Sequence, residues 1–322
     1  MKRRRFITCS LGTAGLTALG WRASQLSSLE KVTRTSRALG SQVHLTVYAK
    51  SRSGGEMAID AALAAIDRVE DTMSLYRPAS ELNQLNCTGA LEQPSNELLE
   101  VLQFATQLSE ESNGSFDVTV QPLWELYAGK ALPSSTELAE ARKHVGWNKI
   151  TIEPHGILLQ DGSTITLNGI AQGYAADAAR AALAKHGIEH AIVDAGEISS
   201  IGNHVEREHW SVGIRHPRED GMIGIAQLNG RCLATSGDYE TIFGGNHDLH
   251  HLFDPNTGRS ANACASVSVV APTAMKADAF STTCFVLGIE RGLKFIESKP
   301  EVDALFFTKD GKMIRSGNFP LS

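Results

Sequence analysis

An aspartate in an otherwise apolar segment is the first candidate for chemistry in this sequence. Asp278 is the one formal charge between Lys276 and Glu290, among Ala, Phe, Ser, Thr, Cys, Val, Leu, Gly and Ile. The segment predicts a buried helix that begins just after Pro272 and ends at Gly288. Because a buried carboxylate must be protonated, hydrogen-bonded or paired with a cation, this helix carries either a site or a satisfied core aspartate.

Two hydroxyl groups lie near the helix face that carries Asp278. Thr282 follows it by four residues and Ser281 by three, so both side chains are expected beside the carboxylate. Carboxylate and hydroxyl oxygens at this spacing suit a hard cation such as Mg²⁺, which keeps open positions for phosphate oxygens. The competing interpretation is a hydrogen-bonded core aspartate, with Thr282 bonding back to its own helix. This stretch alone leaves both interpretations open.

Other polar segments could face a ligand. The turn at 166–173 has spaced glycines that would expose backbone groups to a phosphate or its metal, although it matches neither a P-loop nor a dinucleotide fingerprint. Tyr76 lies in a polar loop and could stack on a planar ligand, whereas a half-buried surface aromatic explains it at least as well. Asp117 could bind a ligand hydroxyl or cap a turn. His251 precedes Asp254 by three residues in a further polar turn.

The N-terminus is typical of an export signal. The basic residues 2–5 precede a moderately apolar run at 6–21, which is too short and too weakly apolar for a stable membrane span. The twin-arginine export pattern is matched by RRRFIT, and a basic cytosolic tail is the alternative. The sequence therefore predicts a signal peptide at 1–24, delivery to the bacterial periplasm, and a single domain at 25–322.

Charge and cysteine spacing exclude several classes of protein. Without the five basic residues of the signal, the chain has 25 basic and 36 acidic side chains, a formal charge of −11. An acidic surface argues against nucleic acid and against an anionic membrane surface as partners. The cysteines beyond the signal are too widely spaced to match a disulfide scaffold or a zinc site; they are Cys87, Cys232, Cys264 and Cys284.

Periodicity predicts helices and strands that are interspersed without a strict βαβ order, which favours an α+β fold. Besides the helix after Pro272, we expect helices at 56–72, 95–112, 138–144 and 174–186. Strands are expected at 43–49, 150–153, 157–160, 164–167, 190–194, 210–214, 223–228, 231–235 and 266–270.

Taken in order, these motifs resemble those of the FAD:protein FMN transferases, the ApbE family, from about residue 39 to residue 288. The matching strings are YRPASELNQLN, GSFDVTVQPLWEL, NGIAQGYAAD, VDAGE, WSVGIRHPR, ATSGDYE, HHLFDPNTG and SVVAPTAMKADAFSTTCFVLG. The resemblance implies one compact unit of helices packed on largely antiparallel sheets. It implies an enzyme that binds FAD, uses Mg²⁺ on the pyrophosphate, and transfers FMN to a Thr or Ser hydroxyl of a client protein, releasing AMP.

The resemblance also implies which residues act. The metal ligands would be Asp278, Thr282, Ser281 and the backbone carbonyl of Gly169. The flavin site would draw on Leu39, Tyr76, Ser115, Phe116, Asp117, Thr166, Gln172 and Leu252. A general base could come from His251 or Asp254, and the sequence does not choose between them.

The chain departs from the common family pattern at three of these positions. Leu39 stands where the family commonly has Met, Thr166 where it has Asp, and Gln172 where it has Lys. Because one acid and one base are lost together, the two polar changes could compensate each other. The strings TLNGIAQG and VDAGEI resemble a periplasmic subgroup that includes accessory proteins of nitrous-oxide reductase maturation.

Two alternative functions use the same residues. A Mg²⁺-dependent FAD pyrophosphatase would admit water in place of the client hydroxyl, and a non-catalytic protein would bind flavin in the periplasm without reaction. In the transferase interpretation the client is a periplasmic or membrane-anchored flavoprotein, and no nucleic acid is involved.

Overall fold

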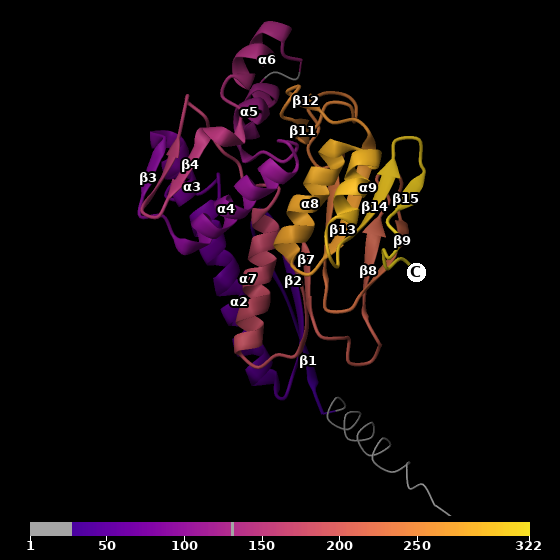
Figure 1. Ribbon diagram of the computed structural model, residues 1–322. Helices are drawn as coiled ribbons and strands as arrows, with labels where there is room; N and C mark the ends of the chain where they lie inside the picture. Colours follow the sequence, from indigo (N-terminus) through magenta and orange to yellow (C-terminus); the bar gives the residue numbers. More distant parts are fainter. Residues whose placement is uncertain (1–27, 130–131) are drawn as a thin grey trace, which may run out of the picture.

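An eight-stranded antiparallel sheet organises the chain in the computed structural model, which describes residues 28–129 and 132–322 (Figure 1). The expected signal peptide at 1–24 lies outside the described residues. Neighbouring strands in the sheet are, in order, β1 (Glu30–Ala38), β2 (Ser41–Ala49), β6 (His190–Asp194), β7 (Ile198–Ile201), β10 (Cys232–Gly237), β13 (Cys264–Ala271), β14 (Asp303–Thr308) and β15 (Met313–Arg315). The predicted α+β class with largely antiparallel sheets is confirmed.

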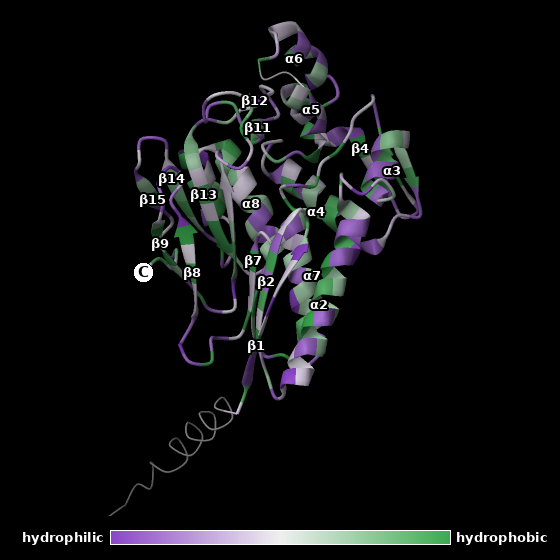
Figure 2. Cartoon of the chain, turned by 180° about the vertical axis from the view of Figure 1, so that it is seen from behind, coloured by the Kyte–Doolittle hydropathy of each residue, from purple (hydrophilic) through white to green (hydrophobic). Residues whose placement is uncertain are grey.

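Side chains alternate between the two faces of this sheet, and each face is covered differently. On one face Val43, Leu45 and Val47 of β2 pack in the main core with α2 (Arg52–Met73), α7 (Ala171–Lys185) and α8 (Ala274–Leu287) (Figures 1 and 2). On the other face Tyr48 packs with a hairpin formed by β8 (Trp210–Arg215) and β9 (Met222–Leu228). The helices thus converge on one side of the sheet.

Smaller elements surround this framework. A three-stranded sheet of β3 (Ala90–Glu92), β5 (Gly156–Leu159) and β4 (Ile150–Glu153) lies near α3 (Glu81–Thr88) and α4 (Asn96–Glu111). At one end of the molecule, α5 (Gln121–Gly129) and α6 (Ser135–Arg142) lie near the short hairpin of β11 (Phe253–Asp254) and β12 (Arg259–Ser260) (Figure 1). The helix α9 (Ile289–Glu297) follows α8 directly and packs on β14.

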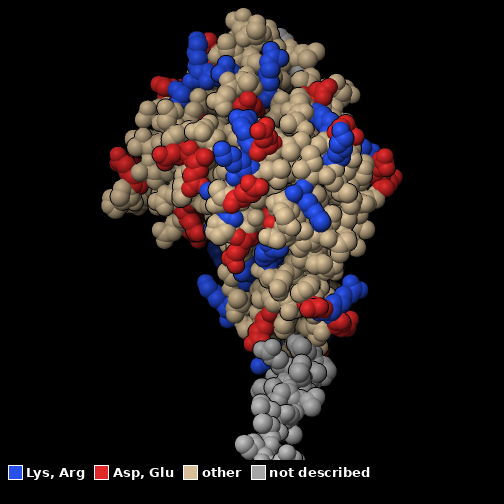
Figure 3. All heavy atoms as spheres, turned by 45° about the vertical axis from the view of Figure 1, so that its right-hand side comes forward, with Lys and Arg blue, Asp and Glu red and all other residues tan. Residues whose placement is uncertain are grey.

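The surface carries mixed charge. On the face shown in Figure 3, acidic and basic side chains are interspersed, and no broad basic area is present on it. Within the described ranges, no helix is both long and apolar enough to cross a lipid bilayer.

The strand expected at 164–167 is not formed. The backbone of Ile165 instead pairs with the side chain of Asn86, whose Oδ1 accepts from Ile165 N at 2.8 Å and whose Nδ2 donates to Ile165 O at 2.8 Å. Thr166 N donates to the Val118 carbonyl at 2.8 Å. The segment is therefore satisfied by a side-chain amide and one isolated backbone bond, which periodicity cannot reveal.

The buried helix expected after Pro272 is confirmed as α8. Thr273 caps its N-terminus by accepting from Lys276 N at 3.3 Å, and Gly288 ends it with a φ of 75°. The N-terminus of α7 packs directly on the first turns of α8. A Cβ atom at Gly173 would overlap the Ala274 carbonyl oxygen and lie 2.8 Å from Asp278 Cβ, so the approach of the two helices requires glycine here.

The close contact between α7 and α8 at Gly173 predicts the effect of adding a methyl group there. Alanine normally favours a helix over glycine by up to about 1 kcal/mol, but at position 173 it must displace the α8 backbone. We expect Gly173→Ala to lower the free energy of unfolding by roughly 1–3 kcal/mol, measured from urea midpoints. Gly129→Ala in α5, where an added Cβ meets nothing within 4 Å, is the matched control and should be neutral or slightly stabilising. Equal stabilities for both variants would contradict the packing argument.

Candidate active site

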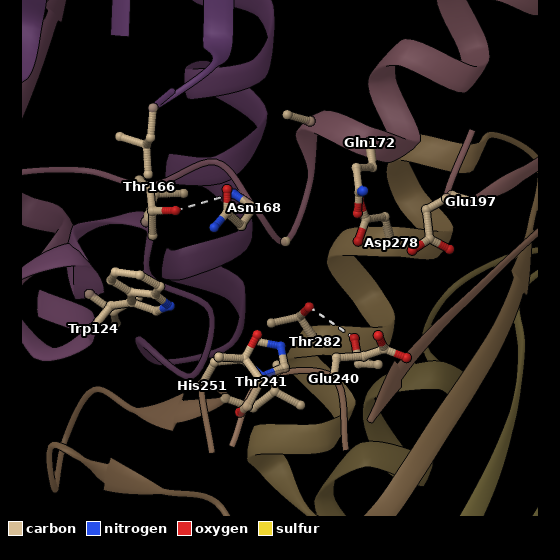
Figure 4. Close-up of a pocket in the computed structure, with 18 of the residues that line it drawn as sticks. Trp124, Thr166, Asn168, Gln172, Glu197, Glu240, Thr241, His251, Asp278 and Thr282 are labelled. Atoms are coloured by element: carbon tan, nitrogen blue, oxygen red, sulfur yellow. Dashed lines mark hydrogen bonds between the residues drawn. The ribbon is translucent and has the colours of Figure 1, made fainter. Parts of the chain in front are cut away.

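A cavity of about 510 Å³ opens where the helical layer meets the strand ends of the large sheet (Figure 4). Its walls come from the end of α2, the loop at 115–120, the turn before α7, the end of β10, the segment 251–255 and α8. The lining mixes apolar groups such as Phe116 and Trp124 with at least as many polar side chains.

The structure brings most of the expected site residues to this one cavity. Those that line it span the chain from position 39 to position 282; they are Leu39, Tyr76, Ser115, Phe116, Asp117, Thr166, Gly169, Gln172, His251, Leu252, Asp278 and Thr282. Ser281 and Asp254 do not line it. Ser281 is fully buried, donates to the Asp278 carbonyl at 2.8 Å and bonds Ser236 Oγ at 2.7 Å. The Ser281 hydroxyl is thus engaged behind α8 rather than presented to the cavity.

Oxygen atoms from two elements meet at the α8 wall. Asp278 Oδ2 accepts a hydrogen bond from Gly173 N at 3.0 Å, which leaves the other carboxylate oxygen without a protein donor among the described residues. The Thr282 hydroxyl lies 3.1 Å from Ser236 Oγ, and the backbone of Gly169 lies against it, because a Cβ there would be 3.1 Å from Thr282 Oγ1. A carboxylate, a hydroxyl and a backbone segment are thereby gathered at one point.

This oxygen set fits a hard cation better than a soft one. Among the described residues, no three His, Cys, Asp or Glu side chains cluster as a metal cage, so a zinc-type site is not formed there. Mg²⁺ is commonly held by one or two carboxylates together with substrate phosphates and water. The residues at the α8 wall fit that pattern: Asp278 would be the charged ligand, and Thr282 and Gly169 would be neutral ones.

The cavity is acidic. Its described lining includes five carboxylates and neither Lys nor Arg; the acids are Glu70, Asp117, Glu197, Glu240 and Asp278. Two of them are satisfied by the protein: Glu70 pairs with Arg77 at 3.0 Å, and Asp117 accepts from Thr119 N at 2.8 Å and from Trp147 N at 2.9 Å. The other three lie toward α8, where no cationic side chain lines the wall (Figure 4).

Burial sets the protonation of the two innermost acids. Loss of hydration raises the pKa of Asp278 to about 7, and the hydrogen bond from Gly173 N offsets only part of that effect. Burial also raises the pKa of Glu197 well above its ordinary value, the neighbouring Asp278 charge adds to this, and the Thr235 backbone N–H opposes it. Two such carboxyls side by side favour either a shared proton or a bound cation.

The structure separates the two candidates for general base. His251 lines the cavity, and its Nδ1 lies 3.4 Å from the Thr241 carbonyl oxygen. Burial lowers the pKa of His251, so its ring is neutral near pH 7. Asp254 accepts from Asn256 N at 3.0 Å and from Thr257 Oγ1 at 3.3 Å. Its carboxylate therefore closes the turn after β11.

Aromatic and apolar groups form the opposite side. Tyr76 is 79% exposed at the rim, whereas Phe116 is buried. Asp117 caps the short 3-10 helix Val118–Val120, so at least part of its role is structural. Leu39 adopts a φ of 53°, and its N–H donates to Glu70 Oε2 at 3.1 Å. These contacts place the expected flavin residues around one opening.

Thr166 and Gln172 do not form a pair. Thr166 Oγ1 accepts from Asn168 N at 3.3 Å, whereas the Gln172 amide lies against Gly196, where an added Cβ would be 2.9 Å from Nε2. Figure 4 shows the two side chains on different sides of the cavity, and no hydrogen bond joins them within the described chain. Direct compensation between these two positions has no support in this geometry.

Several lining residues were not among the expected site residues. Glu197 and Glu240 are the final residues of the quoted strings VDAGE and ATSGDYE, and Trp124 lies within GSFDVTVQPLWEL. Their presence in those strings was a signal for the site. Which of their side chains face the cavity depends on strand ends and helix rotation that the strings do not encode.

Known proteins match this chain in sequence and structure over most of its length. The family model described as ApbE family matches residues 39–306. An FAD:protein FMN transferase of Treponema pallidum is 30% identical over 95% of this chain and 90% of its own length. The crystal structure of the ApbE protein from Thermotoga maritima superposes with a TM-score of 0.82 at 29% identity, covering 89% of this chain and 97% of that one. The flavin transferase ApbE from Vibrio cholerae gives 0.78 at 29% identity, with 90% and 98% covered.

The buried carboxylate predicts a pH-dependent stability when no cation is bound. Between about pH 4 and pH 7 the folded state keeps a proton on Asp278 that the unfolded state has released, so stability should fall as pH rises through that window. Asp278→Asn removes this charge. Urea unfolding in a chelator should find the variant more stable at pH 8 by about 1 kcal/mol or more, with the gap narrowing toward pH 5. A gap independent of pH would contradict the assignment.

Proposed function

The chain belongs to the ApbE family, and on that premise we propose that it is an FAD:protein FMN transferase that uses a divalent cation at Asp278 and releases AMP. Its relatives of this name match along most of their own length, and the enzyme transfers FMN from FAD to a client protein. The observation that carries the details of the proposal is the α8 wall, where Asp278, Thr282 and Gly169 meet in an acidic cavity.

The charge of the cavity supports a cation. The pyrophosphate of FAD is anionic, and the described lining holds carboxylates with neither Lys nor Arg to face it. Like charges at close range raise the free energy of binding unless a cation lies between them. A divalent cation bound there would neutralise the pyrophosphate and the developing charge on the leaving phosphate. Asp278, Thr282 and Gly169 would hold it.

The proposed reaction needs no nucleophile from this chain. The client's Ser or Thr oxygen attacks the FMN phosphorus, the bond from that phosphorus to the bridging oxygen breaks, and AMP leaves with that oxygen. The flavin is then joined to the client through a phosphoester. We assign the proton of the attacking hydroxyl to Nε2 of His251. The Nδ1 of His251 faces the Thr241 carbonyl and so carries the other ring proton, and the lowered pKa keeps the ring ready to accept.

The remaining lining residues have positional roles in this proposal. The flavin ring would lie on the side of the cavity formed by Tyr76, Phe116 and Leu252, since aromatic and apolar surfaces suit a planar heterocycle. Gln172 and Thr166 would offer neutral hydrogen bonds. Tyr76 is exposed at the rim on this flavin side of the cavity.

A single assay tests the proposal. Purified protein is incubated with FAD, Mg²⁺ and a candidate client, and the flavin is followed by in-gel fluorescence and mass spectrometry. Covalent flavin on the client supports transfer, free FMN with AMP indicates a pyrophosphatase, and unchanged FAD indicates a binding protein. We expect Asp278→Ala to reduce transfer by a factor of about 10² or more, because cation contacts to the pyrophosphate are lost.

Two further variants are compared in that assay, one as a control and one as a test of the general base. Asp310→Ala changes an exposed acid that does not line the cavity and should transfer at the wild-type rate. His251→Ala should lose transfer while it still binds FAD. An Asp278→Ala protein that turns over FAD at the wild-type rate would show that the cation site is placed wrongly.

We also propose that the protein acts in the periplasm after twin-arginine export, with a periplasmic or membrane-anchored client. The support is the motif at residues 3–7, which lies outside the described part of the chain. Replacing Arg3 and Arg4 with Lys keeps the positive charge but removes the arginine pair, so the precursor should remain in the cytoplasm. Cell fractionation measures this, and normal periplasmic accumulation of the variant would contradict the proposal.

A further inference from the structure

The helices α7 and α8 meet along an antiparallel seam that is regular in sequence. The contacting positions 169, 173, 177 and 180 are spaced by four, four and three residues, so they share one face of α7 and of the turn that precedes it. Because the two helices are antiparallel, later residues of α7 contact earlier residues of α8. The contacts are Gly169 with Thr282, Gly173 with Asp278 and Ala274, Asp177 with Ala274 and Met275, and Arg180 with Pro272. One end of this seam is the proposed cation site.

Asp177 makes two hydrogen bonds to the first turn of α8 at the other end of the seam. Its Oδ1 accepts from Ala274 N at 3.0 Å and its Oδ2 accepts from Met275 N at 2.9 Å. With Thr273 accepting from Lys276 N, the first amides of α8 are all satisfied, two of them by a side chain from another helix. A carboxylate at this position also stabilises the positive end of the α8 dipole.

The Asp177 carboxylate is itself held in place. Ser199 Oγ, from β7, donates to Oδ1 at 3.1 Å, and Arg180 Nη1 lies 4.0 Å away. The same Arg180 atom donates to the Pro272 carbonyl at 3.1 Å, so it ties α7 to the residues that lead into α8. Because Asp177 does not line the cavity, it would contact neither FAD nor a cation bound there.

We propose that Asp177 is a positioning residue that fixes the register of α8 on α7 and thereby forms the cation site. This inference rests on the cation site of the proposed function. A slip of α8 by one residue moves it 1.5 Å along its axis and turns it by about 100°, which would take Asp278 and Thr282 away from Gly169. Metal ligands need placement within about 0.5 Å. Asp177 supplies that constraint from the opposite end of the contact.

Metal binding without FAD or client tests the inference. Mn²⁺ is titrated into the metal-free protein and followed by electron paramagnetic resonance. Asp177→Ala should weaken Mn²⁺ binding at least tenfold. Asp177→Asn keeps one acceptor oxygen and should show a smaller loss. The matched control is Tyr174→Phe, which removes another polar contact of α7, the hydrogen bond to Glu100 at 3.0 Å, and should change Mn²⁺ affinity less than twofold.

A kinetic measurement separates positioning from simple stabilisation. In the transfer assay, Asp177→Ala should raise the Mg²⁺ concentration for half-maximal activity at least tenfold, while kcat recovers at saturating Mg²⁺. Unchanged Mn²⁺ affinity in Asp177→Ala, with only a lower melting temperature, would overturn the inference. If the alanine variant does not fold, Asp177→Asn decides in the same way, and wild-type affinity in it overturns the inference.

The two proposals can fail separately. A wild-type protein that binds Mn²⁺ but modifies no client refutes the proposed transfer, whereas loss of Mn²⁺ affinity in Asp177→Ala would still support the positioning role. A wild-type protein that binds no Mn²⁺ overturns the positioning role.

Discussion

The structure of the cavity depends on one costly placement, the burial of the Asp278 carboxylate on an apolar helix. A charge removed from water is stable only with hydrogen bonds or a cation beside it. The protein supplies one backbone donor, Gly173 N, and that donor can reach the carboxylate only because position 173 lacks a side chain. The raised pKa of Asp278 reflects the part of the desolvation cost that this one hydrogen bond does not offset. A bound cation would complete the compensation.

This incomplete compensation would link a bound cation to FAD. When ionised, Glu197, Glu240 and Asp278 oppose an anionic ligand in the absence of metal. With a cation present, the same carboxylates would hold the positive charge that neutralises the pyrophosphate. Because binding free energies are coupled reciprocally, a metal that favours FAD binding is itself bound more tightly when FAD is present. An acidic cavity therefore suits an enzyme whose substrate arrives with its metal.

The rest of the fold keeps these groups from moving. At the end of β10, the buried Asp238 forms two hydrogen bonds of 2.7 Å with Arg218, and Lys309 lies 3.5 Å away. The loop that carries His251 is packed through stacked Phe243 and Phe253 rings, 6.0 Å apart between centroids. The large sheet joins these braces to α7 and α8, so segments far apart in sequence keep a fixed geometry around the cavity.

The sequence by itself determined the local features: the buried helix at 272–288, the spacing of Asp278 and Thr282 on one face, and the motifs that surround the cavity. Tertiary structure decided the rest. It turned the Ser281 hydroxyl back onto α8, closed Asp254 into a turn, placed Glu197 beside Asp278, and replaced the expected strand at 164–167 by a pairing with Asn86. Helical periodicity follows from bonds between near neighbours, which a short stretch of sequence encodes. The partner of a polar group is set by which distant segments the core brings within 3 Å, and no local pattern contains that information.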